Sequence, residues 1–414
     1  MLSKKLKPMW TKFKNLELLQ KSFLGIVFLY AIIALFYFLN RSPGGDEMLF
    51  ISDLELIKNK GWIRAIEKNI SIPYMLLVYP ISLILKNYIA LRLVNLLLLV
   101  LLFVYFAKRK NTFELSFYGY LLFFISTVGY FYFGTNDALF FIGLIIYLNE
   151  VNQLQKNNKW YGTIAIIALL IAFFTRKLIF VFFPILIFSW YILYKKNGFK
   201  SINIKIVVLV LTFFLGLNFP SFLNKGNISY DLKNPPKNIK ATWVQRQYLA
   251  QLMVNEGSLP NNNHPSWEKT DAYLTENGEN SLPKRTIDGI FFDINLTVKE
   301  FFKEIYSCMF YGFRQLGLIL FIPLFFLIKD VLKTKRLNVS LMIPICLLLM
   351  ISVFSLIIIS FMETRWLAPV FILTIVYFSD LQKEKVWNTN LITANYTVLL
   401  FLSLYGIFSL WTKF

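Results

Sequence analysis

Long apolar stretches recur along most of this chain of 414 residues, and they constrain its fold more than any other feature. Many reach the roughly 18 residues that a helix needs to cross a bilayer, from Phe23 to Leu39 near the start to Leu391 to Leu410 near the end. Helices suit this role because they satisfy every backbone polar group internally. Hydrophobic residues make up 57% of the chain and charged residues 16%, against about a quarter charged in soluble proteins. The sequence therefore predicts an all-α polytopic membrane protein in contact with the lipid bilayer.

Basic residues set the predicted orientation. The net charge of +20 does not indicate a nucleic-acid partner, because the lysines lie in short connectors between apolar stretches rather than on one soluble face. Six lysines in Met1 to Lys21 place the N-terminus in the cytoplasm. The apolar stretch Ile72 to Leu85 is short for a span, and the basic cluster Lys108 to Lys110 falls in the cytoplasm only if that stretch does not cross. We therefore place it at the outer surface, after an amphipathic helix that begins near Met48 and ends at Gly61.

This orientation divides the chain into three parts. Residues 1–222 form an N-terminal transmembrane module whose first outer loop covers residues 40–88. Residues 223–304 form a long extracytoplasmic loop, and residues 305–414 form the C-terminal transmembrane helices. The long loop is predicted to be folded, because its acids and bases are balanced and it contains many aromatic residues.

About eleven spans are expected, and the first is predicted to be an uncleaved signal anchor. Within the long outer loop, helices are expected over Thr242 to Val254 and over Ser266 to Glu276. The expected spans are approximately Ser22 to Asn40, Ile89 to Ala107, Leu115 to Phe133, Ala138 to Leu148, Trp160 to Phe174, Leu178 to Tyr194, Ile206 to Phe222, Cys308 to Ile328, Val339 to Phe361, Leu367 to Ser379 and Leu391 to Leu410.

Charged and polar residues gather at the helix ends that this orientation places outside. The lysines alone set this orientation, so the gathering of other charged and polar residues on one side is an observation independent of it. A single charged residue at a helix end is often an anchor that reaches water from the interface. Four such clusters on one side favour a shared cavity instead. The clusters are Asp46 with Glu47, Asn136 with Asp137, Arg176 with Lys177, and Glu363 with Thr364 and Arg365.

Such a cavity would contain the groups that transfer of a sugar from a lipid phosphate requires. The guanidinium of Arg365 would hold a phosphate through paired hydrogen bonds, and Arg176 or Lys177 would add positive charge to stabilise the leaving phosphate. Asp46 would take the proton from the incoming hydroxyl. Glu47 is either a further catalytic carboxylate or a group that orients the loop or binds sugar hydroxyls.

Several short motifs, in their order along the chain, resemble those of the dolichyl-phosphate-mannose-protein mannosyltransferase superfamily. Its members include the aminoarabinose-lipid A transferases and are integral-membrane glycosyltransferases of the C-type (GT-C) fold. The motifs cover residues 44–184 and a short late segment. They are Gly45-Asp46-Glu47, Ile72-Pro73-Tyr74, Ala90-Leu91-Arg92-Leu93, Asn136-Asp137-Ala138, Phe174-Thr175-Arg176-Lys177, and Glu363-Thr364-Arg365-Trp366-Leu367-Ala368-Pro369.

The resemblance implies an outer-face active site in the first loop, with two juxtamembrane helices there. It also implies that Asp46 is the catalytic base, that Asp137 assists by binding acceptor, metal or sugar, and that Arg365 contacts the donor phosphate. The donor would be a sugar on a polyprenyl phosphate, and direct displacement would invert the anomeric centre. Trp62 and Trp366 are candidates to stack on a sugar, and Glu363 joins them as a candidate for binding sugar or acceptor.

The metal requirement is open at this stage. Many members of the superfamily have a histidine before the proline that corresponds to Pro73, whereas this chain has Ser71 and Ile72 there, and its one histidine, His264, lies in the long loop. A histidine-rich metal site is therefore not expected. Asp46 and Asp137 would be the ligands if the site holds Mg²⁺ or Mn²⁺.

The sequence thus predicts a glycosyltransferase that acts at the outer face of a bacterial cytoplasmic membrane. It would transfer sugar from a polyprenyl-phosphate donor to a hydroxyl of a glycan, lipid or protein. Two alternatives remain. One is a transporter or flippase of a lipid-linked saccharide, because charges in a membrane also mark substrate pathways. The other is a polysaccharide ligase or polymerase that uses a lipid diphosphate donor.

Overall fold

The fold is described by a computed structural model that covers residues 3–110, 114–231, 235–236, 238–336, 338–384, 386 and 389–413, with side chains from residue 16 onward. Every regular element in these ranges is a helix. The N-terminal half contains α1 (Ser3–Asn40), α2 (Asp46–Glu67), α3 (Ile72–Ser82), α4 (Asn87–Lys110), α5 (Leu115–Val128), α6 (Asp137–Asn157), α7 (Gly162–Thr175), the 3₁₀ helix η1 (Lys177–Phe182), α8 (Phe183–Lys195), the 3₁₀ helix η2 (Gly198–Ser201) and α9 (Ile204–Lys225). The C-terminal half contains α10 (Trp243–Asn255), α11 (Trp267–Asn277), α12 (Thr286–Phe292), α13 (Ile294–Leu316), η3 (Gly317–Leu320), α14 (Phe321–Thr334), η4 (Val339–Leu341), α15 (Met342–Ser355), η5 (Thr364–Leu367), α16 (Ala368–Lys383) and α17 (Thr389–Trp411).

Membrane-spanning character is confirmed. Within the described ranges, 7 helical segments are long and apolar enough to cross a bilayer, and four shorter apolar helices accompany them. The predicted count of about eleven spans stays a prediction, as does the GT-C fold. The long segments are Leu16–Asn40, Asn87–Lys110, Lys177–Lys195, Ile204–Lys225, Ile294–Thr334, Thr364–Lys383 and Thr389–Trp411, and the shorter ones are Ile72–Ser82, Leu115–Val128, Gly162–Thr175 and Val339–Ser355.

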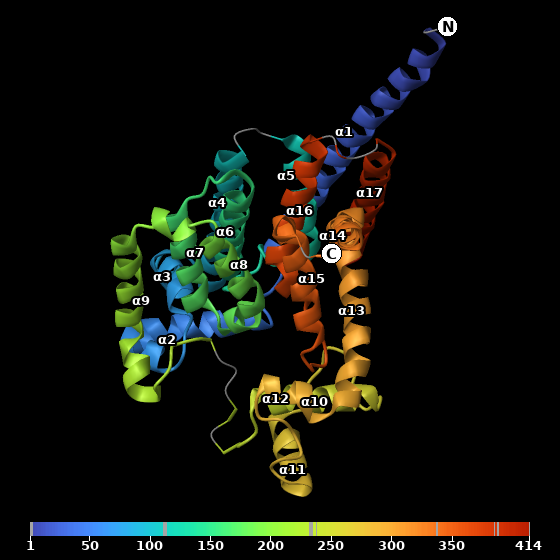
Figure 1. Ribbon diagram of the computed structural model, residues 1–414. Helices are drawn as coiled ribbons and strands as arrows, with labels where there is room; N and C mark the ends of the chain where they lie inside the picture. The colour runs from blue at the N-terminus through green and yellow to red at the C-terminus, as the bar shows by residue number, and fades with distance from the viewer. Residues whose placement is uncertain are drawn as a thin grey trace.

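The segment predicted as the first outer loop contains two helices, α2 and α3. In Figure 1, α2 lies across the lower end of the N-terminal helices, with α3 beside it. Phe50, Leu54 and Ile57 of α2 are buried, at the spacing of one helical face. Gly61, where the amphipathic helix was predicted to end, has φ 78° and kinks α2, which then continues to Glu67.

The predicted span over residues 308–328 differs most from the observed helices. A single helix, α13, begins at Ile294, within the residues predicted as the outer loop, and ends at Leu316. Gly317 then adopts φ 59°, and α14 continues in a new direction; it is seen almost end-on in Figure 1. A positive φ costs glycine little, and the backbone can therefore turn within an otherwise apolar run.

The segment predicted to be the long outer loop, here called the outer domain, packs around a small core of its own and contains both expected helices, α10 and α11. Thr242 caps α10 in a capping box with Gln245. The domain core contains Tyr248 and Leu249 of α10 and Leu274 of α11. Ile358, from the connection between α15 and η5, packs into the same core and joins this outer domain to the membrane helices.

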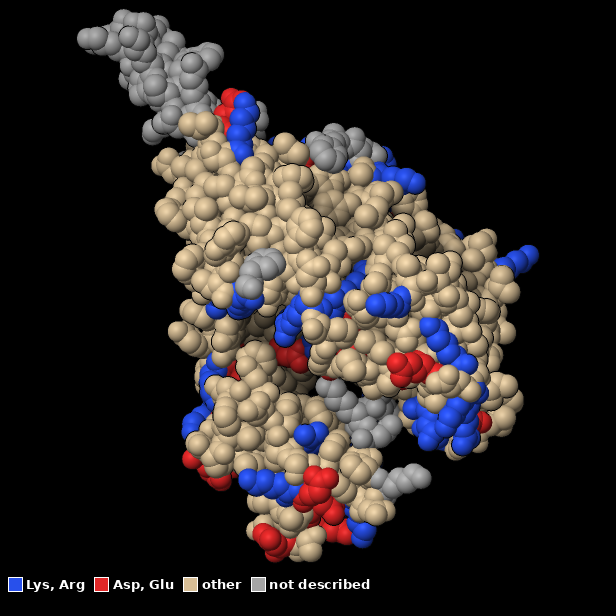
Figure 2. Space-filling view, turned by 180° about the vertical axis from the view of Figure 1, so that it is seen from behind, with Lys and Arg blue, Asp and Glu red and all other residues tan. Residues whose placement is uncertain are grey.

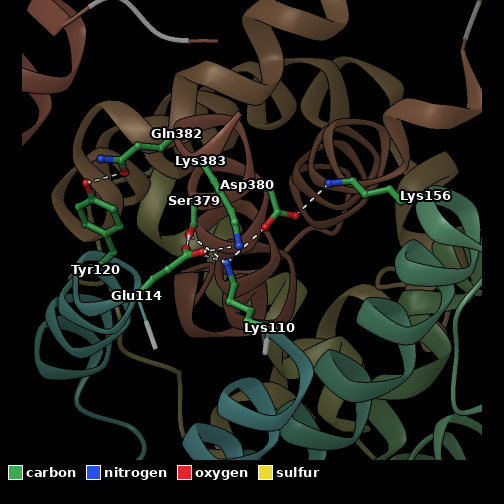
Figure 3. A network of polar contacts seen from close by, with 8 residues as sticks. All are labelled: Lys110, Glu114, Tyr120, Lys156, Ser379, Asp380, Gln382 and Lys383. Carbon is green, nitrogen blue, oxygen red and sulfur yellow. Dashed lines mark hydrogen bonds and ion pairs between the residues drawn. The ribbon is translucent and has the colours of Figure 1, made fainter. Parts of the chain in front are cut away.

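The end of the bundle opposite α2 is held together by charged residues (Figure 3). Lys110 Nζ lies 3.3 Å from Asp380 Oδ1, and Lys156 Nζ lies 3.0 Å from Asp380 Oδ2. Lys383 pairs with Glu114 at 3.2 Å. Three lysines that were predicted to lie in the cytoplasm thus share one end of the bundle, away from the clusters predicted to lie outside. Of the pair of lysines predicted to mark the cytoplasmic end of the span over residues 367–379, Lys385 lies outside the described residues.

Candidate functional site

A buried arginine at the start of η5 forms the centre of the candidate site. Arg365 Nη2 lies 2.8 Å from Asp46 Oδ2, and its Nη1 lies 3.2 Å from Asp137 Oδ2. Its Nε pairs with Glu363. The ring of Tyr130 lies under the guanidinium, with 4.2 Å between Arg365 Cζ and the ring centroid. One guanidinium therefore joins carboxylates from three separate loops, which is the convergence that the sequence predicted.

A second guanidinium completes the cluster. The backbone of Arg176 is extended where α7 ends, and its side chain pairs with Asp137. Asp137 is 1% exposed, so its carboxylate is enclosed by the two guanidinium groups that it contacts. Asp231, from the outer loop, lies beside them: Asn136 Nδ2 donates to its Oδ1 over 2.9 Å, and the charge of Arg176 acts on it. Figure 2 shows a hollow between the membrane helices and the outer domain, in which acidic and basic side chains meet.

Helix α4 positions the first loop through a buried ion pair. Arg92 is 2% exposed, and its Nε and Nη2 donate to the two carboxylate oxygens of Glu47 over 2.8 and 2.6 Å. Its Nη1 donates to the carbonyls of Leu39 and Arg41, at the end of α1. Both charges are buried, and the bidentate geometry offsets the cost of removing them from water. Arg92 thereby fixes the chain just before Asp46.

Both carboxylate oxygens of Glu47 accept hydrogen bonds. Besides Arg92, the backbone N–H of Gly134 donates to its Oε1 over 3.0 Å. A Cβ at Gly134 would lie 2.8 Å from that oxygen and 2.4 Å from the Cβ of Leu91, so only glycine allows this approach. Of the two roles predicted for Glu47, the geometry favours holding the loop over contact with a reacting substrate.

The same face of α4 positions the second loop. Asn95, one turn after Arg92, donates through Nδ2 to the carbonyls of Phe133 and Thr135, the latter over 2.9 Å. These residues lead directly into Asp137, the first residue of α6. Two polar residues at i and i+3 of one apolar helix therefore set the positions of both candidate acids, Asp46 and Asp137.

The carbonyl of Thr175, just before Arg176, joins three loops. The hydroxyl of Ser71 donates to it over 2.8 Å, and Asn136 Nδ2 donates to it over 3.2 Å. Ser71 belongs to the first outer loop and Asn136 to the second. The backbone that carries Arg176 is thus fixed by hydrogen bonds rather than by packing alone.

Residues 229–231 of the outer loop are fixed in a similar way. Ser229 N–H donates to Asn218 Oδ1 over 2.8 Å, and the Ser229 hydroxyl accepts from the N–H of Ile70 over 2.9 Å. The hydroxyl of Tyr230 donates to the carbonyl of Phe173 over 2.9 Å. These bonds place Asp231 against the site. Asp231 was not among the predicted site residues, because a single acid after a span carries no local signal.

Arg92, Asn95 and Tyr130 were also not predicted as site residues. Arg92 and Asn95 did carry a signal, because polar side chains inside an apolar span need partners there. Arg92 was predicted only as part of the motif Ala90-Leu91-Arg92-Leu93. Tyr130 follows Gly129, which ends α5, and nothing in its surroundings in the sequence distinguishes it from other aromatic residues of the chain.

Three further predicted site residues have surroundings that the structure describes. Lys177 is exposed at the start of η1, and the ring of Trp62 packs edge-on against Tyr79 of α3, with 5.3 Å between centroids. Trp366 packs on Phe354 of α15 at 5.7 Å. Their predicted roles stay predictions.

The carboxylates do not form a metal cage in the described part of the chain. Asp46 and Asp137 each face the guanidinium of Arg365 rather than each other. Within the described residues, no group of three or more His, Cys, Asp or Glu side chains could hold a metal ion. Whether the site uses Mg²⁺ or Mn²⁺ therefore stays a prediction.

Burial shifts the titration of the acids around the site. Burial raises the pKa of Asp231, while the nearby charges of Arg176 and the hydrogen bond from Asn136 oppose the rise. Asp53, on the buried face of α2, has its pKa raised to about 8 by burial and by the charge of Asp231. Its Oδ2 has no hydrogen-bond partner among the described residues. Asp53 is therefore protonated at neutral pH.

Comparison with known proteins adds no family: no family model matches the chain, and neither a curated protein nor a solved structure matches it significantly.

Proposed function

We propose that this protein is a membrane glycosyltransferase that moves a sugar from a polyprenyl-phosphate donor to a hydroxyl acceptor at the outer face of a bacterial cytoplasmic membrane. The observation that supports it is the cluster of Asp46, Asp137, Arg176 and Arg365, which come from four separate loops. Charged residues at the surface of a membrane protein need not meet, and long-range ion pairs of this kind are typical of functional sites.

The proposed reaction is a single displacement. The acceptor oxygen attacks the anomeric carbon of the sugar, the bond from that carbon to the phosphate oxygen breaks, and the lipid phosphate leaves with the electron pair. Asp46 is the candidate base that takes the acceptor proton, because it is partly exposed beside Arg365, whereas Asp137 is buried. Arg365 and Arg176 would stabilise the negative charge on the leaving phosphate.

The ion pair between Asp46 and Arg365 suggests an order of events. A donor phosphate that binds Arg365 competes with Asp46 for the same guanidinium N–H groups. Binding of the donor would therefore release Asp46 toward the acceptor at the moment a base is needed. Asp137 is held by both arginines and would keep them in place while this exchange occurs.

The experiment is a transfer assay on purified protein in liposomes, with a radiolabelled polyprenyl-phosphate sugar and candidate glycan, lipid and hydroxyl-peptide acceptors, each with and without Mg²⁺ or Mn²⁺. Asp46→Asn is expected to lose transfer by about a hundredfold or more, as is usual for loss of a general base. Asp380→Asn is the matched control, because the two aspartates are similarly exposed and both are ion-paired. The side chain of Asp380 is 25% exposed and that of Asp46 is 24% exposed. Full activity of a folded Asp46→Asn protein would contradict the proposal.

The same assay separates the two alternatives. A flippase would move the labelled lipid across the liposome membrane without covalent change. A ligase or polymerase would use a polyprenyl diphosphate donor and not the monophosphate. In the described structure, the charged clusters lie near the two ends of the bundle, whereas transporter sites lie typically near the midplane, which favours the enzyme over the flippase.

A further inference from the structure

Helices α12 and α13 carry an exposed apolar face that was not predicted from the sequence. Six large apolar or aromatic side chains follow one another along α12 and the first half of α13, spaced three or four residues apart. Each is more than half exposed. Within each of the two helices, spacing of this kind places the side chains along one side. They are Ile287, Phe291, Ile294, Val298, Phe302 and Tyr306.

The opposite side of α13 already has a partner. Glu300 is buried there, and its Oε1 accepts a hydrogen bond from Asn255 Nδ2 of α10 over 2.8 Å. Thr297 is also buried and donates to the carbonyl of Ile290 in α12 over 2.8 Å. The outer domain thus covers one side of the helix and leaves the apolar side open.

We propose that this apolar face of α12 and α13 lies in the outer leaflet of the bilayer, so that the outer domain is seated in the membrane rather than held above it. The face continues without interruption into the upper half of α13, where Phe310 is also exposed within the candidate span Ile294–Thr334. In Figure 1, α13 stands upright with its first turns beside α10 and α12. A helix of 23 residues is about 34 Å long, enough to cross the hydrocarbon core of roughly 30 Å.

Charge at the borders of the face fits lipid rather than protein as the occupant. Lys284 and Arg285 precede α12 directly and are exposed, and Lys299 is exposed on α13. Long basic side chains at the edge of an apolar helix face reach lipid phosphates while their stems stay in the apolar layer.

Seating the outer domain would also set its height over the candidate site. Ile358 packs in the domain core and is followed closely by Glu363 and Arg365. The position of the domain therefore constrains the segment that carries the central arginine. This inference rests on the membrane location and not on the proposed reaction.

The test is nitroxide labelling of the full-length protein in vesicles of phosphatidylethanolamine and phosphatidylglycerol, using Phe291→Cys and Val298→Cys. The native cysteines, Cys308 and Cys346, are buried and are expected to react slowly. Thr275→Cys, exposed on α11, is the aqueous reference. Phe408→Cys, exposed on α17 within a candidate span, is the lipid reference.

We expect labels at positions 291 and 298 to show a several-fold higher ratio of oxygen to nickel-chelate accessibility than the label at 275, close to that at 408. Accessibility equal to that of the aqueous reference would overturn the proposal. Spin–spin broadening that disappears on dilution with unlabelled protein would assign the face to a second copy of the chain and would also overturn it. Circular dichroism and size-exclusion profiles of each variant verify the fold.

Discussion

At the residue scale, the candidate site depends on side chains that hold its carboxylates in place. Arg92 holds Glu47 by two hydrogen bonds in an enclosed setting, and Glu47 fixes the start of α2, where Asp46 lies. Removing one partner of a buried ion pair leaves an uncompensated charge, whereas replacing both by apolar side chains does not.

Arg92→Leu is therefore expected to destabilise the protein by about 3–5 kcal/mol, and the double variant Arg92→Leu with Glu47→Leu by clearly less. The measurement is the free energy of unfolding, obtained by titrating a denaturing detergent into micelles of a mild one and monitoring helix content by circular dichroism. Equal destabilisation of the single and the double variant would show that the two charges are not coupled.

Asp53 provides a prediction about pH. Its folded-state pKa of about 8 lies above the value near 4 of an unfolded chain, so the folded protein retains a proton that the unfolded chain releases in that interval. Stability should fall as the pH rises from about 4 to about 8, by up to roughly 1.4 kcal/mol per pH unit from this group.

Asp53→Asn removes this dependence because an amide cannot lose the proton. The difference in Tm between the variant and the wild-type protein should be smallest at pH 5 and should grow in favour of the variant toward pH 8. A Tm difference between variant and wild type that is the same at pH 5 and pH 8 would mean that Asp53 is ionised in the folded protein.

At the element scale, the packing of α6 on α7 depends on a close approach at Gly143. A Cβ there would lie 2.6 Å from the carbonyl oxygen of Ala168 and 3.0 Å from the Cβ of Ala172. Small residues allow helix backbones to approach in membranes, where lipid provides no hydrophobic drive for association. α6 begins with Asp137, so its position matters to the site.

Gly143→Ala should therefore lower the Tm, while Gly216→Ala in α9 should leave it unchanged or raise it. Nothing lies within 4 Å of a Cβ at Gly216, and alanine favours a helix over glycine by about 1 kcal/mol. The measurement is thermal unfolding of both purified variants under the same conditions. A similar shift in both would indicate that the α6–α7 contact is loose.

The helices that could be predicted are those with a continuous apolar pattern. α4, α9 and α17 lie close to their predicted positions, because length and hydropathy alone decide that a segment prefers lipid. The turn at Gly317 could not be predicted, because an isolated glycine in an apolar run is compatible with either a straight or a broken helix.

At the scale of the whole molecule, the sequence predicted that loops distant along the chain meet, but not how. The residues of the charged cluster were identified from their shared side of the membrane, which follows from the lysines. The partners within the cluster depend on side-chain positions that one sequence does not reveal. Asp231 reaches the site only because Ser229 and Tyr230 bind backbone groups of other segments.

The outer domain is connected to this cluster through Ile358. Ile358→Ala should loosen the domain from the membrane helices, with a loss of about 2–4 kcal/mol expected for a buried isoleucine. Limited proteolysis should then cut the outer domain faster than in Ile345→Ala, a core variant of α15 with similar burial. Equal cleavage of the two variants would mean that Ile358 does not couple the domain to the site.

The most direct measurement of the central claim is an electron cryo-microscopy structure of the protein with a polyprenyl-phosphate sugar bound. The account predicts density for the phosphate against the guanidinium groups of Arg365 and Arg176, with Asp46 displaced from its present 2.8 Å contact with Arg365. Phosphate density elsewhere, with the pair between Asp46 and Arg365 intact, would contradict it.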